Sequence, residues 1–240
     1  MELTRSPEIV VPSTLTGASV ERLLADVTEQ ARACPDVLVI RGSVERFCSG
    51  LDLEEAIAGS PVTATRVAMF AACLEALRRF PAPVIAVVAG AATGGGVGLA
   101  AAADVVIAST RSTFAITELL FGLVPAVVTP TLLTRLSPAR LTLWAMTGDL
   151  WDAEAAKVAG LVDVVVPVEA LEDAASLWTR RVARADCDAL RELKALLCDL
   201  TAGRAPDVAA ITAARLNDPG VRGRLQAFAQ DGVAPWRQQR

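Results

Sequence analysis

Short runs of apolar residues recur through the first two thirds of the chain, and their length is typical of buried β-strands. The strands predicted in this way are 9–11, 37–40, 84–88 and 105–108, with further short runs at 113–116 and 162–166. Residues 41–50, which follow the second run, are predicted to form a loop.

Between the strands, apolar residues recur every three or four positions, as they do on the buried face of a helix. The first such segment, 20–31, follows Ser19 as a possible N-cap, and the second, 67–77, is stopped by Pro81. Further helices are predicted from the glycines at 94–98 to about 103, over 153–159, and through most of 169–228 with a break at 218–220.

The order of these elements predicts how the chain is organised. Strands alternate with helices up to about residue 167, which predicts an α/β core over residues 1–167. Residues 168–240 have mostly helical spacing, and we expect them to form a helical C-terminal region. At 240 residues the chain is long enough to bury a sizeable core.

One uncharged segment, residues 80–103, is long enough to span a bilayer. However, Pro81, Pro83 and the glycines at 94–96 divide it into a strand, a turn and a helix. The aromatic belt and basic flank that frame a membrane helix are also missing. We therefore expect no membrane association.

Composition narrows the class of protein. Apolar residues make up 53% of the chain, and alanine and valine supply much of this, which favours close backbone packing. The net charge is −4, and the arginines are scattered, so no nucleic-acid footprint is present. Five cysteines without a C-x-x-C pair favour reduced thiols. The N-terminus also lacks a signal-peptide pattern. We expect a cytoplasmic protein.

The residue types that are missing limit the possible chemistry. The chain has no histidine and no tyrosine, which excludes Ser-His-Asp and Cys-His mechanisms and metal sites built on imidazole. No cluster of carboxylates indicates an oxygen-ligand site, so we expect no metal. Catalysis would have to rest on carboxylates, backbone dipoles, hydroxyl groups or arginine.

The glycine stretch 94–98 follows a predicted strand and opens a predicted helix. Backbone N–H groups at such a turn point toward whatever lies above it and favour a developing oxyanion. The stretch is not a P-loop, because no Gly-Lys-Ser/Thr follows it. Glycines also serve close helix packing, so this feature alone leaves both interpretations open.

A second turn, FCSGLDL at 47–53, follows another predicted strand. Gly50 permits the backbone twist that would present the Leu51 N–H. For Asp52 we favour a simpler role, in which its carboxylate caps the following turn.

Glu118 lies between the apolar segments 115–117 and 119–121. Such surroundings suit a carboxylate that acts as a base. A solvated glutamate in the first turn of a helix fits the pattern equally well.

Three motifs occur in one order: FCSGLDL, then VIAVVAGAATGGGVGLAAAADVVIAS, then TFAITELLFGLVPA. In this the chain resembles the crotonase (enoyl-CoA hydratase/isomerase) superfamily. The resemblance implies an α/β fold, a crotonase-type spiral of ββα units. It also implies a homotrimer whose helical C-terminal region, 168–240, packs on a neighbouring subunit or covers the active site.

The same resemblance implies roles for individual residues. The N–H groups of Leu51 and Gly95 would form an oxyanion hole for a thioester carbonyl, and Glu118 would exchange the proton at the adjacent carbon. The expected substrate-binding residues are Leu51, Asp52, Gly94, Gly95 and Gly96. No cofactor is implied, because the substrate is carried on coenzyme A or on the phosphopantetheine of an acyl carrier protein.

Gly98 departs from the two-glutamate hydratase pattern, because the first glutamate of that pattern would stand at this position. The remaining motifs, with TELLFGLVPAVVTPTLL, LNDP and GVAPW, resemble those of the dehydratases of polyketide β-branching. The partner decarboxylases of such pathways rely on lysine and histidine; here histidine is missing, and Lys157 and Lys194 lie outside the motif region. A decarboxylase is therefore disfavoured.

The function expected from this resemblance is dehydration of 3-hydroxy-3-methylglutaryl on an acyl carrier protein to the 3-methylglutaconyl thioester. One alternative is a Δ3,Δ2-enoyl isomerase, which also needs one main acid/base. Another is a non-catalytic acyl-carrier-binding module that has lost a glutamate. The expected partners are an acyl carrier protein and further copies of the chain.

Overall fold

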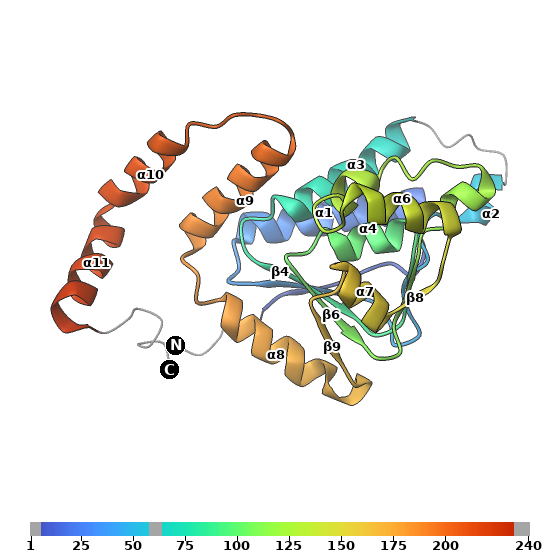
Figure 1. Cartoon of the computed structure of the whole chain (residues 1–240), viewed down its shortest axis with the longest axis horizontal. Coiled ribbons are helices and arrows are strands. Elements are labelled where there is room, and N and C mark those ends of the chain that lie inside the picture. Colours follow the sequence, from blue (N-terminus) through green and yellow to red (C-terminus); the bar gives the residue numbers. More distant parts are fainter. Residues whose placement is uncertain (1–5, 58–63, 233–240) are drawn as a thin grey trace.

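Two sheets of mostly parallel strands lie at the core of the molecule (Figure 1). The computed structural model describes residues 6–57 and 64–232, and within them one sheet has five parallel strands in the order β1-β2-β4-β6-β9. Their bounds are β1 Glu8–Val10, β2 Leu38–Arg41, β4 Val84–Val88, β6 Val105–Ser109 and β9 Val164–Val166.

The second sheet is made of shorter strands in the order β3-β5-β7-β8. These strands are β3 Arg46–Cys48, β5 Ala91–Thr93, β7 Thr113–Ala115 and β8 Trp151–Asp152. β8 is antiparallel to β7, and the other pairs are parallel. Because β2-β4-β6 and β3-β5-β7 follow the same order, each turn of the chain adds one strand to each sheet. This arrangement is the predicted spiral of ββα units.

Helices connect the turns of this spiral and continue beyond it. Those of the spiral are α1 Gly17–Ala33, α2 Leu53–Ile57, α3 Ala64–Arg78, α4 Gly95–Ala101, α5 Thr129–Leu132, α6 Pro138–Thr147 and α7 Ala153–Ala159. After β9 come α8 Leu171–Val182, α9 Cys187–Thr201, α10 Val208–Asn217 and α11 Pro219–Asp231, and the 3-10 helices are η1 Glu118–Phe121 and η2 Val168–Ala170. None of the helices described here combines the length and apolar character that crossing a membrane requires.

The five-stranded sheet is covered on both faces, which explains why its strands are apolar without alternation. Ile85 and Ile107 belong to a cluster with Leu171 and Ala175 of α8. Side chains on the opposite face of these strands join the main core with α1, α3 and α4. Apart from its first residue, α4 is buried throughout, and its glycines and alanines permit this close packing.

Several boundaries differ from the sequence expectation for local reasons. α1 begins at Gly17 with Thr16 as N-cap, and Ser19 completes a capping box three residues later instead of starting the helix. The stretch 41–50, predicted as a loop, contains β3, which at three residues is too short to show periodicity. α5 and α6 lie where the apolar pattern predicts no element.

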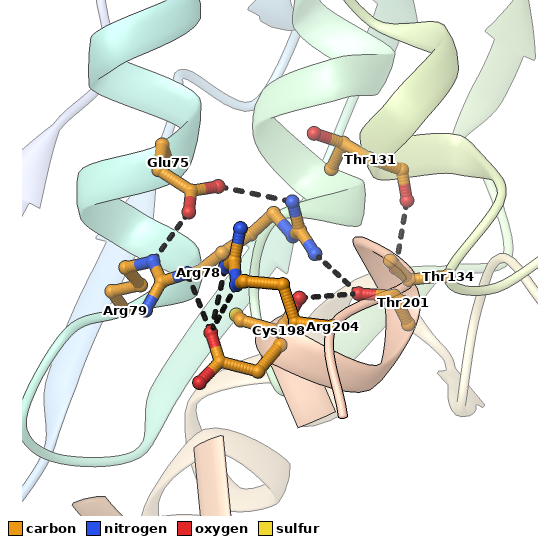
Figure 2. A network of polar contacts seen from close by, with 9 residues as sticks. Glu75, Arg78, Arg79, Thr131, Thr134, Cys198, Thr201 and Arg204 are labelled. Atoms are coloured by element: carbon orange, nitrogen blue, oxygen red, sulfur yellow. Dashed lines mark hydrogen bonds and ion pairs between the residues drawn. The ribbon is translucent and has the colours of Figure 1, made fainter. Parts of the chain in front are cut away.

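α9 is anchored to the spiral by polar contacts (Figure 2). Glu75 of α3 accepts hydrogen bonds from Arg78 and Arg79, and Arg78 reaches the hydroxyl of Thr201 on α9 at 3.5 Å. An ion pair between buried Lys194 and a partly exposed aspartate lies nearby, with Lys194 Nζ 2.6 Å from Asp104 Oδ2. α10 and α11 lie beyond α9, away from the sheets (Figure 1).

Asp186 joins these last helices to α9. Its carboxylate caps α9 by accepting the Ala189 N–H at 2.9 Å, and it pairs with Arg215 of α10 at 2.7 Å and Arg224 of α11 at 2.9 Å. The backbone hydrogen bond from Ala189 and the charges of Arg224 and Arg215 lower the pKa of Asp186. One carboxylate therefore links three helices.

Replacing the carboxylate of Asp186 should loosen the C-terminal helices. Asp186→Asn keeps a capping acceptor but removes the charge, and should cost about 1 kcal/mol in denaturant unfolding at pH 7. Because the folded pKa is lowered, the carboxylate's contribution is present at neutral pH and is lost as the pH falls through that folded pKa. The difference from the wild type should therefore shrink in acid. Asp207→Asn, at the cap of α10, is the control. An equal cost for both variants would contradict the role of the ion pairs.

Candidate active site

Three of the sequence-predicted residues follow the ends of three adjacent parallel strands. Leu51 follows β3, Gly95 follows β5, and Glu118 follows β7. Since carboxyl ends of parallel strands meet at one edge of a sheet, the pairing brings all three segments together. The Gly94 N–H extends this pairing by donating to the Ala115 carbonyl at 2.9 Å.

The turn at Gly50 lies directly against the turn at Gly95. Gly50 has φ +79°, and a Cβ atom there would lie 2.8 Å from the Thr93 carbonyl oxygen and 2.9 Å from Gly95 N. The Thr93 hydroxyl also donates to the Ser49 carbonyl at 2.9 Å. Glycine at position 50 therefore lets the Leu51 and Gly95 segments approach each other.

Neighbouring hydrogen bonds leave the N–H groups of Leu51 and Gly95 without a protein acceptor among the described residues. The Leu15 N–H donates to the Gly50 carbonyl, and the Leu15 carbonyl accepts from the Asp52 N–H. The backbone groups on either side of the Leu51 N–H are therefore bonded to Leu15, whereas the Leu51 N–H itself is not. The Gly95 N–H is the first of α4 and has no acceptor within the helix. Both N–H groups are available to a ligand carbonyl.

Glu118 is the first residue of η1, and its side chain lies beside Gly94. A Cβ atom on Gly94, whose φ is +51°, would lie 2.9 Å from Glu118 Oε1. The other oxygen, Oε2, is buried and has no hydrogen-bond partner within the described part of the chain. Glu118 thus stands in the first turn of a helix, but one of its oxygens is shielded from solvent.

A cavity of about 400 Å³ opens above these segments. Leu51, Gly94, Gly95 and Glu118 are all on its wall. Most other lining side chains are apolar; they come from the N-terminal end of α1, from α3 and from the segment after η1, and include Leu15, Val20, Phe70, Leu123 and Val128. A mostly apolar wall lowers the local dielectric constant, and this strengthens hydrogen bonds made inside the cavity.

Val128 occupies the space beside Gly98. A Cβ atom on Gly98 would lie 2.5 Å from Val128 Cγ1 and 3.6 Å from Leu74 Cδ1. The position where two-glutamate relatives would have their other carboxylate therefore faces an apolar side chain. Glu118 is the one acidic residue among those described on the cavity wall.

Asp52 and Gly96, which the resemblance placed among the substrate-binding residues, are not on the cavity wall. The Asp52 carboxylate accepts the Glu55 N–H at 2.9 Å at the start of α2, which is the capping role favoured from the sequence. Gly96 packs against the Cys48 carbonyl so closely that a side chain has no room. Asp52 thus caps α2, and Gly96 allows α4 to pack against β3.

Other potentially reactive groups are held away from chemistry. Burial raises the pKa of Cys48 to about 11 and that of Cys73 to about 12, so both thiols stay protonated at neutral pH. Lys194 is paired with Asp104 outside the cavity. In residues 6–57 and 64–232, no group of three or more Cys, Asp or Glu side chains is arranged to hold a metal ion.

The model of the enoyl-CoA hydratase/isomerase family matches residues 19–239. The chain belongs to this family. A relative named "Probable enoyl-CoA hydratase EchA17", from Mycobacterium tuberculosis, is 34% identical over 167 residues, 68% of this chain and 63% of that protein. The carnitinyl-CoA dehydratase of Proteus mirabilis is 37% identical over 160 residues, 66% of this chain and 61% of its own length. The match thus spans less than two thirds of either relative.

Solved structures share the fold. The enoyl-CoA hydratase of Bacillus anthracis superposes with a TM-score of 0.81 over 93% of this chain and 92% of its own, at 26% identity. Pseudomonas aeruginosa AtuE superposes with a TM-score of 0.85 over 95% of both chains, at 27% identity. The predicted α/β spiral with a helical C-terminal region is therefore confirmed.

Sequence reasoning missed most of the side chains that line this family member's cavity, among them Val128 and Arg66. Arg66 stands four residues before Phe70, on the same face of α3, but just outside the apolar pattern that predicts a helix over 67–77. Extending that helix by one turn would have found it. Val128 lies between elements, and the pattern contains no signal for its position.

The contact between Gly98 and Val128 predicts a measurable coupling. Gly98→Ala should strain the packing, whereas the same change in a Val128→Ala background should be tolerated or stabilising, because the methyl group then has room. We expect a coupling free energy of about 1 kcal/mol or more from a double-mutant cycle in urea. Additive effects would show that the two residues do not share this space.

Proposed function

We propose that the chain is an enzyme of the hydratase/dehydratase type, which acts on a 3-hydroxyacyl thioester through a thioester enolate. The observation behind this proposal is a buried, unpartnered Glu118 oxygen on the same cavity wall as two N–H groups without acceptors. A base and two donors in one apolar cavity suit removal of a proton next to a polarised carbonyl. Membership of the enoyl-CoA hydratase/isomerase family supports the same reaction class.

In the proposed mechanism, the Leu51 and Gly95 N–H groups donate to the thioester oxygen and stabilise the negative charge that develops there. Removing one donor of such a pair typically costs about 3 kcal/mol in the barrier. Glu118 accepts the proton from the carbon next to the thioester. The enolate then expels the β-hydroxyl, and the carbon–carbon double bond forms.

The departing hydroxyl needs a proton, and protonated Glu118 is the proposed source. In the described residues, no second carboxylate lines the cavity, and Val128 fills the space beside Gly98. The hydroxyls of Thr93 and Ser49 already donate to the carbonyls of Ser49 and Ser13. One carboxylate would then take and return the proton on the same face, as in a syn elimination.

The substrate that we propose is 3-hydroxy-3-methylglutaryl on an acyl carrier protein, dehydrated to the 3-methylglutaconyl thioester in polyketide β-branching. This finer assignment is supported by motifs alone: Gly98 in place of a glutamate, the segment TELLFGLVPAVVTPTLL, LNDP and GVAPW. All but the first residue of GVAPW lies outside the described residues. The acyl group would be carried on phosphopantetheine, with no further cofactor.

A homotrimer is also part of the proposal. α10 and α11 lie away from the sheets and expose large apolar side chains, among them Leu216 and Leu225, which are 54% and 51% exposed. A second copy of the chain would cover such a face. Sedimentation equilibrium should then give the mass of three chains, and a monomer mass would contradict the assembly.

An enoyl isomerase is the second candidate, favoured by Glu118 being the one carboxylate that the described residues bring to the cavity wall. The two reactions differ in mass. A carrier-bound 3-hydroxy-3-methylglutaryl group should lose one water when the enzyme is added, whereas a 3-enoyl thioester that is isomerised keeps its mass. Inactivity on both substrates, with measurable carrier binding, would support a non-catalytic carrier module.

The two acidic residues of the site region should respond differently to loss of charge. Glu118→Gln should lower the dehydration rate by about 10³-fold or more, because the amide cannot accept the α-proton. Asp52→Asn should retain near wild-type activity, because asparagine still caps α2. Rates from intact-mass analysis of the carrier would measure both. Near wild-type dehydration by Glu118→Gln would refute the mechanism.

A further inference from the structure

Arg66 is the one basic side chain among the described residues that line the cavity. The surrounding wall is mostly apolar, with Val67 and Phe70 on the same helix and Val20 on α1, which packs against it. A guanidinium stays charged at any physiological pH, and its field is weakly screened beside such apolar surface. Arg66 therefore places a cationic group on the cavity wall, beside the carboxylate of Glu55.

The position of Arg66 relative to the two N–H groups follows from α3. Arg66, Phe70 and Leu74 are spaced by four residues and share one face of the helix. Along this face, Phe70 Cε1 lies 3.2 Å from a Cβ atom built on Gly95, and Leu74 lies beside Gly98. Arg66 is one turn before Phe70, which is about 6 Å along the helix axis.

Neighbouring groups hold the guanidinium in place. Arg66 forms an ion pair with Glu55 of α2, and the second oxygen of Glu55 accepts the Gly17 N–H at 3.1 Å. Arg66 also covers Gly17, because a Cβ atom there would lie 2.8 Å from its Nη2. Arg66 thus lies beside the first turn of α1, a helix of 17 residues, and the positive end of the helix dipole adds to the positive potential there.

We propose that Arg66 binds a carboxylate at the far end of the acyl chain, and so selects thioesters of dicarboxylic acids. The inference rests on the proposed function, which puts the thioester carbonyl at Leu51 and Gly95. An acyl chain whose carboxylate is four carbon–carbon bonds from the thioester carbon has about the reach of one helical turn. Guanidinium and carboxylate groups match in geometry and can form paired hydrogen bonds.

Glu55 modulates this site. Its negative charge orients Arg66 but repels a second carboxylate. Glu55 and the substrate carboxylate therefore compete for the same guanidinium. Loss of Glu55 charge should therefore strengthen the preference for anionic acyl chains, and loss of Arg66 should abolish it.

A phosphate is the other anion that a carried thioester contains. Phosphates lie at the far end of the pantetheine arm, many bonds from the thioester, whereas Arg66 is one helical turn from Phe70 at the Gly95 turn. This short separation favours the acyl carboxylate as the bound group.

The test compares two N-acetylcysteamine thioesters, glutaryl and its terminal carboxamide, which lack phosphate and a β-hydroxyl. Binding to the full chain, measured by calorimetry, should favour the carboxylate by about 10- to 100-fold. Arg66→Met should remove that preference, Arg66→Lys should keep part of it, and Glu55→Gln should increase it. Equal binding of both thioesters by the wild type, or an unchanged preference in Arg66→Met, would overturn the proposal.

Two further arms separate the possible causes of failure. Because these thioesters cannot be dehydrated, their binding tests Arg66 even if the proposed reaction is wrong, and dehydration of a neutral 3-hydroxyacyl thioester tests the reaction alone. Glutaryl-coenzyme A and its carboxamide reveal a phosphate role, since Arg66→Met would then weaken both equally, contrary to the proposal. If Arg66→Met unfolds, the double variant Glu55→Gln/Arg66→Met removes the unpaired Glu55 charge and is measured instead.

Discussion

The parallel pairing of β3, β5 and β7 is the constraint on which the rest of the site depends. Each strand is three residues long, yet the register of their pairing aligns the ends of three strands that are far apart in the sequence. Cys48 pairs with Ala92, and Thr93 pairs with Ala115, so the turns that follow start side by side. The larger five-stranded sheet holds this ladder in place, because the same turns of the chain build both layers.

Close backbone approach is the second requirement, and it accounts for the composition of the chain. Gly50 and Gly94 have positive φ and have neighbours where a Cβ atom would stand. α4 is buried from Gly96 onward and consists largely of glycine and alanine, with Val97 and Leu99. High apolar content from small residues, visible in the sequence, thus reflects a core in which backbones pack against backbones.

Elements with long apolar runs and residues within motifs could be predicted from the sequence, whereas short elements could not. β4 and α7 have the predicted bounds, because a continuous apolar run and a capped apolar repeat are local signals. β3 was hidden in a predicted loop, since three residues contain no period. The motifs placed Leu51, Gly95 and Glu118 on one site, and the structure brings them to one cavity. The filling of the space beside Gly98 by Val128 is a tertiary contact without a local signal.

Taken together, the strand ends, the two available N–H groups and the shielded Glu118 oxygen describe a site for making an enolate. Exchange of the α-proton with solvent tests this claim most directly, because it needs no leaving group. A saturated acyl thioester without a β-hydroxyl, incubated in D₂O with the enzyme, should gain deuterium at the carbon next to the thioester. Glu118→Gln should show no such gain. Exchange that is equally fast in Glu118→Gln, or is missing in the wild type, would contradict the account.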